Sequence, residues 1–325
     1  MKAIGTIDKT NKGEMGITTL PICLPKAGEI LIKVYAAGVN RADLYQKAGK
    51  YPPPAGASDI LGLEVAGTVE KIGDNASGFA IGDKVCALIE GGGYAEYAIA
   101  HAQQTLPIPN NLNFYEAASI VESAFTVWSN LFDYGHLKKG GKLLVHGGAS
   151  GIGVMAIQIA HNLGIDCYAT AGSDEKCEFI TKLGAKKAIN YKKDSFVEAL
   201  KSDGIRVDMV LDMVGGDYFD KNISVLAKGG RLVSIGFLGS PVAEVNFAPL
   251  LVKNINIIGT TLRDKSPEFK SKISKKLQEI IWPMIEKQQI KPIIDSVFDL
   301  EDFEKAHKKM QSNSNIGKII LRVLA

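Results

Sequence analysis

The segment HGGASGIG (146–153) decides the fold, because it lies directly between a predicted strand and a predicted helix. The strand is the apolar run KLLVHG (142–147), and the helix is GIGVMAIQIAHNLG (151–164), whose final glycine suits a helix C-terminus. Within this segment Gly148 is predicted to permit the tight turn, and Gly153 to let the helix pack closely on the sheet. A turn of this kind presents the positive end of a helix to a pyrophosphate group.

The second glycine of the Gly-x-Gly-x-x-Gly pattern is replaced by Ser150. Its side chain stands where a diphosphate would pass, so that group is expected either to sit further out or to bond the hydroxyl. Gly151 and Ile152 complete the predicted contact surface at the start of the helix. A lone pattern of this type also occurs as an ordinary turn, so the prediction of a dinucleotide site depends on the strands and helices that follow it.

Strands and helices alternate after this turn. The further predicted strands are IDCYATA (165–171), AIN (188–190), VDMVLDMV (207–214), RLVSIG (231–236) and NINIIGT (254–260). The alternation predicts a parallel sheet with helices on both faces. The first hundred residues are instead rich in short strands without this rhythm, which favours an antiparallel, barrel-like domain. A long helix from about Pro267 to near Gln288, followed by the strand KIILRVL (318–324), suits a C-terminal return to that first domain.

Composition sets limits on the function. The chain has 325 residues, a formal net charge of +3 and 46% hydrophobic residues, which is ordinary for a globular protein of about two domains. The near-balanced charge gives no support for a nucleic-acid partner. No segment is apolar enough for membrane insertion, and residues 1–10 lack the apolar stretch of a signal peptide, so a cytoplasmic location is expected.

The residues after the second predicted strand indicate which dinucleotide is bound. An NAD site usually has an acidic residue there, whereas this chain has Ala-Gly-Ser ending at Ser173. Ser173 and Lys176 could bind a 2′-phosphate, and Tyr191 could approach from the side. Asp174 could fill the NAD role, but it is predicted to cap the next helix. NADPH is therefore favoured, while Lys176 as an ordinary surface residue stays open.

Several segments together carry a family resemblance. They are AGVNRADLYQKAGKYPPPAGASDILGLEVAGTVEKIG (37–73), IGDKVCAL (81–88), GGGYAEY (91–97), the HGGASGIG turn, AGSDEK (171–176), INYKKD (189–194) and NIGKIIL (315–321). In these segments the chain resembles the quinone oxidoreductase branch of the medium-chain dehydrogenase/reductase superfamily. The match is closer to the stress-inducible quinone oxidoreductases than to zeta-crystallin.

The resemblance implies a GroES-like barrel domain with an inserted Rossmann domain. The implied boundaries are 1–122 and 265–325 for the GroES-like catalytic domain and 123–264 for the Rossmann domain. A homodimer formed through the edge strand near 254–262 and an active-site cleft between the domains are also implied.

The resemblance further implies that the protein uses no zinc. Zinc-dependent relatives have a Cys where this chain has Asn40, and a His-Glu pair where it has Leu63-Glu64. Zinc needs at least three N, S or O ligands, and these replacements remove two of them. No metal is therefore expected at this position.

The activity implied by the resemblance is hydride transfer from NADPH to a quinone or a related conjugated carbonyl. Asn40 and Tyr51, carried over from the matching segment, are the candidate hydrogen-bond donors to the acceptor oxygen, although Asn40 could hold a loop and Tyr51 could be a packing aromatic. The residues expected near the nicotinamide are Thr126, Gly236, Phe237 and Leu262. The five histidines lie outside these assignments and are expected in solvent-facing or turn positions.

Two alternatives remain open. The same scaffold would suit an enoyl-thioester or 2-alkenal reductase, which a long apolar channel would favour over a short flat slot. A cofactor-binding structural or RNA-binding protein is the non-enzymatic alternative. The near-neutral charge and the lack of interleaved basic and aromatic residues count against RNA binding.

Overall fold

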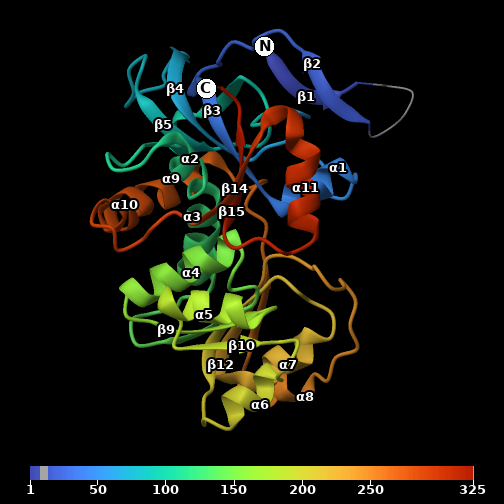
Figure 1. Ribbon diagram of the computed structural model, residues 1–325. Helices are drawn as coiled ribbons and strands as arrows, with labels where there is room; N and C mark the ends of the chain where they lie inside the picture. Colours follow the sequence, from blue (N-terminus) through green and yellow to red (C-terminus); the bar gives the residue numbers. More distant parts are fainter. Residues whose placement is uncertain (8–13, 325) are drawn as a thin grey trace. The chain divides into compact units, whose positions relative to one another are not determined.

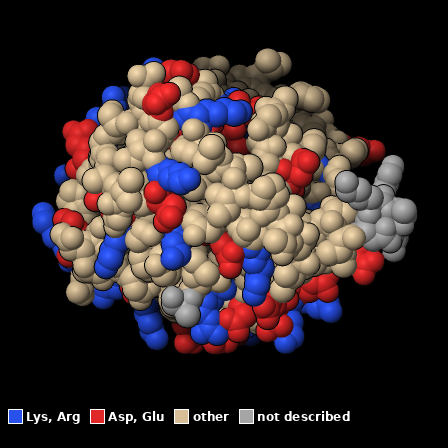
Figure 2. All heavy atoms as spheres, turned by 90° about the horizontal axis from the view of Figure 1, so that it is seen from above, with Lys and Arg blue, Asp and Glu red and all other residues tan. Residues whose placement is uncertain are grey.

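The computed structural model describes residues 1–7 and 14–324, so part of the N-terminal segment 1–10 lies outside the description (Figure 1). No helix in the described part of the chain combines the length and apolarity needed to cross a membrane. Lys and Arg side chains are interspersed with Asp and Glu side chains over the face drawn in Figure 2, in keeping with the small net charge of +3.

The chain forms two compact units. Unit 1 combines Met1–Phe125 with Arg263–Ala325, and unit 2 is the continuous segment Thr126–Leu262. The N-terminal and C-terminal parts of the chain therefore belong to one unit, and in the sequence the residues of the other unit come between them.

Unit 1 is built around a mainly antiparallel sheet. Its strand order is β14-β15-β3-β4-β5-β7, and β6 also pairs with β3. The bounds are β3 (Glu29–Val39), β4 (Glu64–Ile72), β5 (Lys84–Leu88), β6 (Tyr97–His101), β7 (Thr105–Pro107), β14 (Ile294–Asp299) and β15 (Lys318–Arg322). A separate two-stranded sheet contains β1 (Lys2–Thr6) and β2 (Met15–Thr19). This arrangement confirms the predicted antiparallel first domain.

The C-terminal strand completes this sheet. β15 runs antiparallel to β3, with Ile319 opposite Val39 and Leu321 opposite Ala37. Figure 1 shows β14 and β15, coloured as the C-terminal end, beside the N-terminal strand β3. The predicted return of the C-terminus to the first domain is confirmed. It brings Lys318 beside the end of β3.

Short helices accompany the sheet of unit 1. They are α1 (Arg41–Lys47), η1 (Ala102–Gln104), α2 (Phe114–Ala118), α9 (Pro267–Lys276), η3 (Leu277–Ile281), α10 (Trp282–Glu286), η4 (Leu300–Asp302) and α11 (Phe303–Gln311). The single long helix predicted from Pro267 is present but contains the π-helical turn η3. Pro283, in the first turn of α10, lacks a backbone N–H and crowds the preceding turn, which accounts for the local change of register.

Unit 2 is a parallel sheet of six strands. Their order is β10-β9-β8-β11-β12-β13, so the chain order 3-2-1-4-5-6 is that of a Rossmann fold. The bounds are β8 (Lys142–Val145), β9 (Asp166–Ala171), β10 (Lys187–Asn190), β11 (Val207–Asp212), β12 (Leu226–Ser234) and β13 (Asn256–Gly259). All six predicted strands are present, which confirms the fold class.

The helices of unit 2 connect these strands. They are α3 (Val121–Trp128, which enters from unit 1), η2 (Ser129–Tyr134), α4 (Gly151–Asn162), α5 (Asp174–Lys182), α6 (Phe196–Lys201), α7 (Tyr218–Val225) and α8 (Ala248–Lys253). The apolar runs of the central strands β8 and β11 are almost completely buried, as expected for a parallel sheet covered on both faces. Ligands in such sheets bind at the carboxyl ends of the strands, near the point where the strand order reverses.

Candidate functional site

The turn between β8 and α4 has the predicted position but a different turn glycine. Gly147, not Gly148, adopts the left-handed conformation, with φ of +66°. A side chain on Gly148 would place its Cβ within 2.9 Å of Ala169 Cβ and Ile180 Cδ1. The prediction that Gly148 permits the turn was therefore wrong. Gly147 makes the turn, and Gly148 allows close packing.

The start of α4 is organised by Ser150. Its hydroxyl accepts a hydrogen bond from the amide of Gly153 at 3.1 Å and so caps the helix. A Cβ on Gly153 would lie 2.3 Å from the carbonyl oxygen of Gly147, so only glycine lets the helix pack on the turn. The amides of Gly151 and Ile152 occupy the first helical positions, where backbone donors have no acceptor within the helix. This arrangement suits a diphosphate.

The ends of β9 and β10 form the second part of the candidate cofactor site. Ser173, not Asp174, caps α5, because its hydroxyl accepts from the amide of Lys176 at 3.2 Å. The Asp174 carboxylate instead accepts a hydrogen bond from Asn190 Nδ2 at 2.7 Å and forms an ion pair with Lys193. The hydrogen bond from Lys193 lowers the pKa of this carboxyl group. The prediction that Asp174 caps the helix was wrong.

Tyr191 follows β10 and lies beside the end of β9. Its amide donates to the carbonyl of Ala171 at 3.1 Å. A Cβ on Gly172 would lie 2.7 Å from the Tyr191 hydroxyl, so the absence of a side chain at 172 allows this approach. In the structure Ser173, Lys176 and Tyr191 therefore follow the carboxyl ends of the neighbouring strands β9 and β10.

The remaining predicted cofactor residues of unit 2 follow β12 and β13 or lie on α3. A Cβ on Gly236 would lie 3.9 Å from the carbonyl oxygen of Met213, an ordinary contact distance, and Phe237 is about half exposed. Thr126 is buried, and its carbonyl accepts from Asn130 Nδ2 at 2.8 Å. The hydroxyl of Thr260, two residues before Leu262, donates to Asn130 Oδ1 at 2.6 Å. Asn130 thus ties α3 to the end of β13.

In unit 1, the predicted donor Asn40 lies in a buried polar cluster. Its amide nitrogen Nδ2 donates to Glu64 Oε1 at 2.9 Å, and its Oδ1 accepts from Lys318 Nζ at 2.6 Å. Lys318 Nζ lies 2.5 Å from Glu64 Oε1, and a Cβ on Gly38 would lie 2.1 Å from that same oxygen. The two polar ends of the Asn40 amide are therefore already held by neighbouring side chains.

The charges of this cluster determine whether a metal could bind there. Burial by itself lowers the pKa of Lys318, but the charges of Glu64 and Glu122 outweigh it, so the pKa lies above its usual value. The ammonium group therefore stays charged and compensates the buried carboxylate of Glu64. These residues do not fit a zinc ion, because a cation already occupies the oxygens of Glu64 and Asn40. In the described residues, no group of three or more His, Cys, Asp and Glu side chains could hold a metal ion.

A second buried polar cluster adjoins α1. Asp43 accepts hydrogen bonds from the amides of Asn40 and Gly62 and, at 3.1 Å, from the hydroxyl of Tyr94. The Tyr94 hydroxyl also lies 3.2 Å from His307 Nε2. Burial raises the pKa of Asp43 to about 6, although its hydrogen bonds act in the opposite direction. Burial and the charge of Lys47 lower the pKa of His307 to about 4.

The prediction that every histidine faces solvent or a turn was wrong for two of them. His307 is buried in the cluster with Tyr94. His146 is fully buried at the end of the first Rossmann strand, where its Nε2 lies 2.7 Å from Asn222 Oδ1 and its Nδ1 lies 3.0 Å from Thr170 Oγ1. Neither histidine has a local sequence signal, because their partners are far away in the chain.

Tyr51, the other predicted donor, follows α1 in a loop. The guanidinium carbon of Arg263 lies 5.5 Å from the centre of the Tyr51 ring. Burial raises the pKa of the Tyr51 hydroxyl, and the charge of Arg263 opposes this effect. Arg263 was not among the sequence-predicted site residues, because nothing near it in the sequence indicates a contact with Tyr51.

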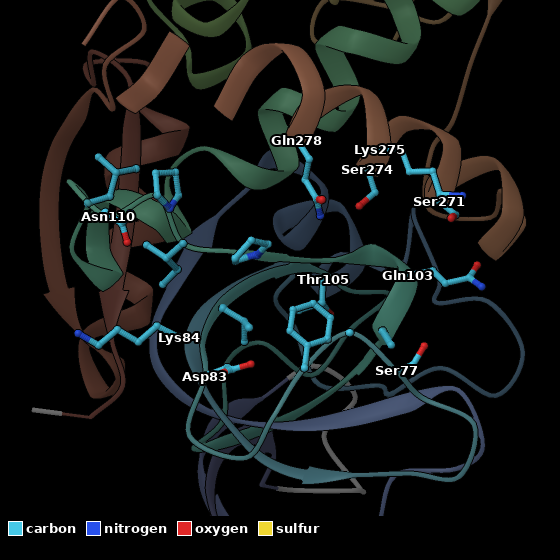
Figure 3. Close-up of a pocket in the computed structure, with 18 residues that line it drawn as sticks. Ser77, Asp83, Lys84, Gln103, Thr105, Asn110, Ser271, Ser274, Lys275 and Gln278 are labelled. Carbon is cyan, nitrogen blue, oxygen red and sulfur yellow. The ribbon is translucent and has the colours of Figure 1, made fainter. Parts of the chain in front are cut away.

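A cavity in unit 1 lies away from these residues. It has a volume of about 730 Å³ and is bordered by η1, β7 and the α9–η3 helix, from which Ser274 and Gln278 point toward it (Figure 3). Its size is within the range of small-molecule sites, but no predicted site residue lines it.

Comparisons with known proteins agree with this fold. A family model described as an alcohol dehydrogenase GroES-like domain matches residues 26–110, and one described as a zinc-binding dehydrogenase matches residues 151–279. The quinone oxidoreductase of Rattus norvegicus is 33% identical over 301 residues, which cover 91% of this chain and 90% of the rat protein.

Two solved structures are similar over the whole chain. The Escherichia coli quinone oxidoreductase in complex with NADPH has a TM-score of 0.87 and 27% identity, covering 99% of this chain and 100% of that one. An NAD-dependent alcohol dehydrogenase has a TM-score of 0.86 and 27% identity, with complete coverage of both chains. The extent of the match to the rat enzyme, together with the shared fold, places this chain in the quinone oxidoreductase branch of the medium-chain dehydrogenase/reductase superfamily.

Proposed function

We propose that this protein reduces quinones with NADPH by hydride transfer. The observation that carries the choice of cofactor is the environment of Asp174. Its carboxylate is bonded to Asn190 and Lys193, whereas an NAD site needs an acidic group that accepts hydrogen bonds from the ribose hydroxyls. The nearby Ser173, Lys176 and Tyr191 can instead donate hydrogen bonds to a 2′-phosphate.

The proposed path of the cofactor follows the carboxyl ends of the strands in unit 2. The diphosphate would bind at the amides of Gly151 and Ile152, beside the Ser150 hydroxyl that caps α4. The nicotinamide half would contact residues that follow β12 and β13 or lie on α3. These are Thr126, Gly236, Phe237 and Leu262.

When bound, NADPH supplies a hydride from C4 of its nicotinamide. Hydride and one proton together convert a quinone to a hydroquinone, so negative charge develops on an acceptor oxygen. We assign the hydrogen bond to that oxygen to the Tyr51 hydroxyl, and one such donor is worth about 3 kcal/mol of transition-state stabilisation. Asn40 is assigned a positioning role, because its amide is bonded to Glu64 and Lys318.

Zinc has no part in the proposed reaction. The description of the family model that matches residues 151–279 refers to zinc, but the Lys318 ammonium takes the position next to Glu64 that a cation would need. No step of the reaction is therefore assigned to a metal. We assign the stabilisation of the charge that develops on the substrate to the hydrogen bond from Tyr51.

The function is tested by binding and turnover. The purified protein is titrated with NADPH and with NADH, and oxidation of the better ligand is followed at 340 nm with an ortho-quinone and a para-quinone. Preferential binding of NADPH together with quinone-dependent oxidation is the expected result. NADPH binding with turnover of enoyl thioesters or 2-alkenals, but not of quinones, would replace the proposed substrate class. A preference for NADH would overturn the phosphate site.

We also propose that two copies of the chain associate through the edge of the Rossmann sheet. β13 is an edge strand, and the segment that directly precedes it in the chain, α8 with Phe247, carries exposed apolar side chains. Leu251 is 85% exposed, Val252 78% and Phe247 65%. An uncovered strand edge beside such a surface favours pairing with another strand, and a second β13 related by a two-fold axis would extend the sheet.

The dimer is tested by light scattering after size-exclusion chromatography. One chain has a mass of 34.9 kDa. The wild-type protein is expected to have twice this mass, and the Leu251→Glu/Val252→Glu variant is expected to have the mass of a single chain. Ile81→Glu is the matched control, because Ile81 is 71% exposed but lies in unit 1. A monomeric wild-type protein would refute the proposal.

A further inference from the structure

Arg263 is a buried arginine with an unusual set of partners. It is the first residue of unit 1 after the inserted segment, and only 6% of its surface is exposed. Its Nε donates to the carbonyl oxygen of Glu90 at 2.8 Å, and its Nη2 donates to the same oxygen. Its Nη1 lies 3.4 Å from the carbonyl oxygen of Tyr51. The direct acceptors of this guanidinium are therefore backbone carbonyls, and no carboxylate of residues 1–7 or 14–324 forms a close ion pair with it.

The backbone around Arg263 is fixed by a second buried cation. Lys270, on α9, is fully buried, and its Nζ donates to the Arg263 carbonyl and to Glu90 Oε1, each at 2.8 Å. Glu90 is thus bonded through its side chain to Lys270 and through its backbone to Arg263. A Cβ on Gly91 would lie 3.3 Å from Arg263 Nη2, which leaves little space for the guanidinium to move.

This frame places the guanidinium at the ring of Tyr51. The distance of 5.5 Å from its central carbon to the ring centre is within the range of cation–π contacts, which are stronger when the groups are desolvated. The contact restricts where the ring can lie. The positive charge also favours any negative charge that develops on the phenolic oxygen when it donates a hydrogen bond.

We propose that Arg263 is a positioning residue for Tyr51, holding the ring in place and strengthening its hydroxyl as a hydrogen-bond donor to the substrate. The inference rests on the donor role proposed for Tyr51. Burial and the charges of Asp264 and Glu122 raise the pKa of Tyr51 above its usual value. The guanidinium charge and the backbone amide of Arg263 act in the opposite direction, as a positioning role requires. Arg263 acts through Tyr51 and is assigned no contact with the substrate.

A double-mutant cycle tests the coupling between the two side chains. The variants are Arg263→Met, Tyr51→Phe and the double variant, each measured for kcat and KM with NADPH and a para-quinone. Arg263→Met is expected to lower kcat about three- to thirtyfold with little change in KM, which is the range of a desolvated cation–π contact. In the Tyr51→Phe background the same substitution is expected to change kcat less than about twofold. An equal loss in both backgrounds would overturn the proposal, because it would indicate a structural effect independent of the hydroxyl.

A spectroscopic measurement separates this inference from the proposed function. The pKa of Tyr51 is obtained from the ultraviolet difference between each protein and its Tyr51→Phe counterpart, without any turnover. Arg263→Met is expected to raise this pKa and Arg263→Lys to raise it less, because lysine keeps the charge but loses the planar group. An unchanged pKa in Arg263→Met would refute the inference. A full kcat in Tyr51→Phe would instead refute the donor role of Tyr51.

Folding controls accompany these variants. Arg322→Met removes an arginine of the same unit whose side chain is 49% exposed, and it is expected to leave kcat and the Tyr51 pKa unchanged. If Arg263→Met does not fold, the test uses Arg263→Lys instead. This variant is expected to lower kcat and to raise the pKa of Tyr51, each by less than predicted for Arg263→Met. No change in either quantity in Arg263→Lys would then count against the proposal.

Discussion

The ammonium group of Lys318 lies 2.5 Å from Glu64 Oε1, and the side chains of both residues are at least 95% buried. The pair joins the C-terminal strand β15 to the start of β4, and the Asn40 amide bonds both partners. A buried pair of this kind contributes little over an apolar pair of the same size, but removing one partner leaves an uncompensated charge.

Removing the Lys318 charge alone is therefore expected to destabilise the protein. Lys318→Met should lower the free energy of unfolding by about 3–5 kcal/mol. Lys318→Met/Glu64→Gln should recover part of that loss, because it removes both charges. Urea unfolding at pH 7 measures both values. Lys276→Met, in an exposed pair with Glu279, should have no measurable effect, and an equally small effect for Lys318→Met would contradict the role of the pair.

His307 is expected to make stability depend on pH. Its pKa is lowered to about 4 in the folded protein from 6.5, so the unfolded chain binds the proton more tightly between these values. Stability therefore falls as the pH falls from about 6.5 to about 4. His307→Gln removes this dependence, and the wild-type protein should lose up to about 3 kcal/mol relative to the variant over that interval. Urea unfolding at pH 4.5 and pH 7 is the measurement.

Asp43 provides an internal comparison of opposite sign. Its pKa is raised from 3.8 to about 6, so the folded protein binds the proton more tightly and stability falls as the pH rises through this interval. Asp43→Asn should therefore shift the stability profile in the direction opposite to His307→Gln. If the free energy of unfolding depends on pH in the same way in the two variants, the opposite pKa shifts of Asp43 and His307 would be contradicted.

Lys176 is expected to discriminate NADPH from NADH. Lys176→Ala should weaken NADPH binding roughly ten- to a hundredfold, the effect of losing a charge-assisted hydrogen bond to phosphate, and should leave NADH binding unchanged. Isothermal titration calorimetry with both cofactors measures the ratio. Lys182→Ala, at the other end of α5, is the control. A parallel loss for both cofactors would assign Lys176 a role other than phosphate recognition.

Ser150 is expected to stabilise α4 as its cap. Ser150→Ala should lower the free energy of unfolding by about 0.5–2 kcal/mol, and Ser150→Gly by only a few tenths, because glycine tolerates the cap conformation and leaves the amide hydrated. Thermal and urea unfolding of the two variants give the comparison. A larger loss for the glycine variant would indicate that the hydroxyl does not cap the helix.

Much of unit 2 could be predicted from the sequence because its determinants are local. The alternation of apolar strands and helices predicted all six strands of the sheet. The glycine-rich turn was found in the right place, although Gly147 rather than Gly148 has the left-handed backbone, since both residues are glycine and the sequence does not distinguish them. The same ambiguity applies to Ser173 and Asp174, which are both good capping residues.

By itself, the sequence determined the order of the elements, the Rossmann topology and the strand ends at which a dinucleotide binds, because these follow from hydrophobic periodicity and from turn residues a few positions apart. Only the tertiary structure decided the partners of Asn40, Tyr51 and His307. Lys318 reaches Asn40 across 278 positions, and Arg263 reaches Tyr51 across 212. These contacts arise because the segment from Arg263 onward folds into the same unit as Met1–Phe125. The partner of a buried charged group is therefore set by which distant segment packs against it. No local pattern in the sequence predicts that partner.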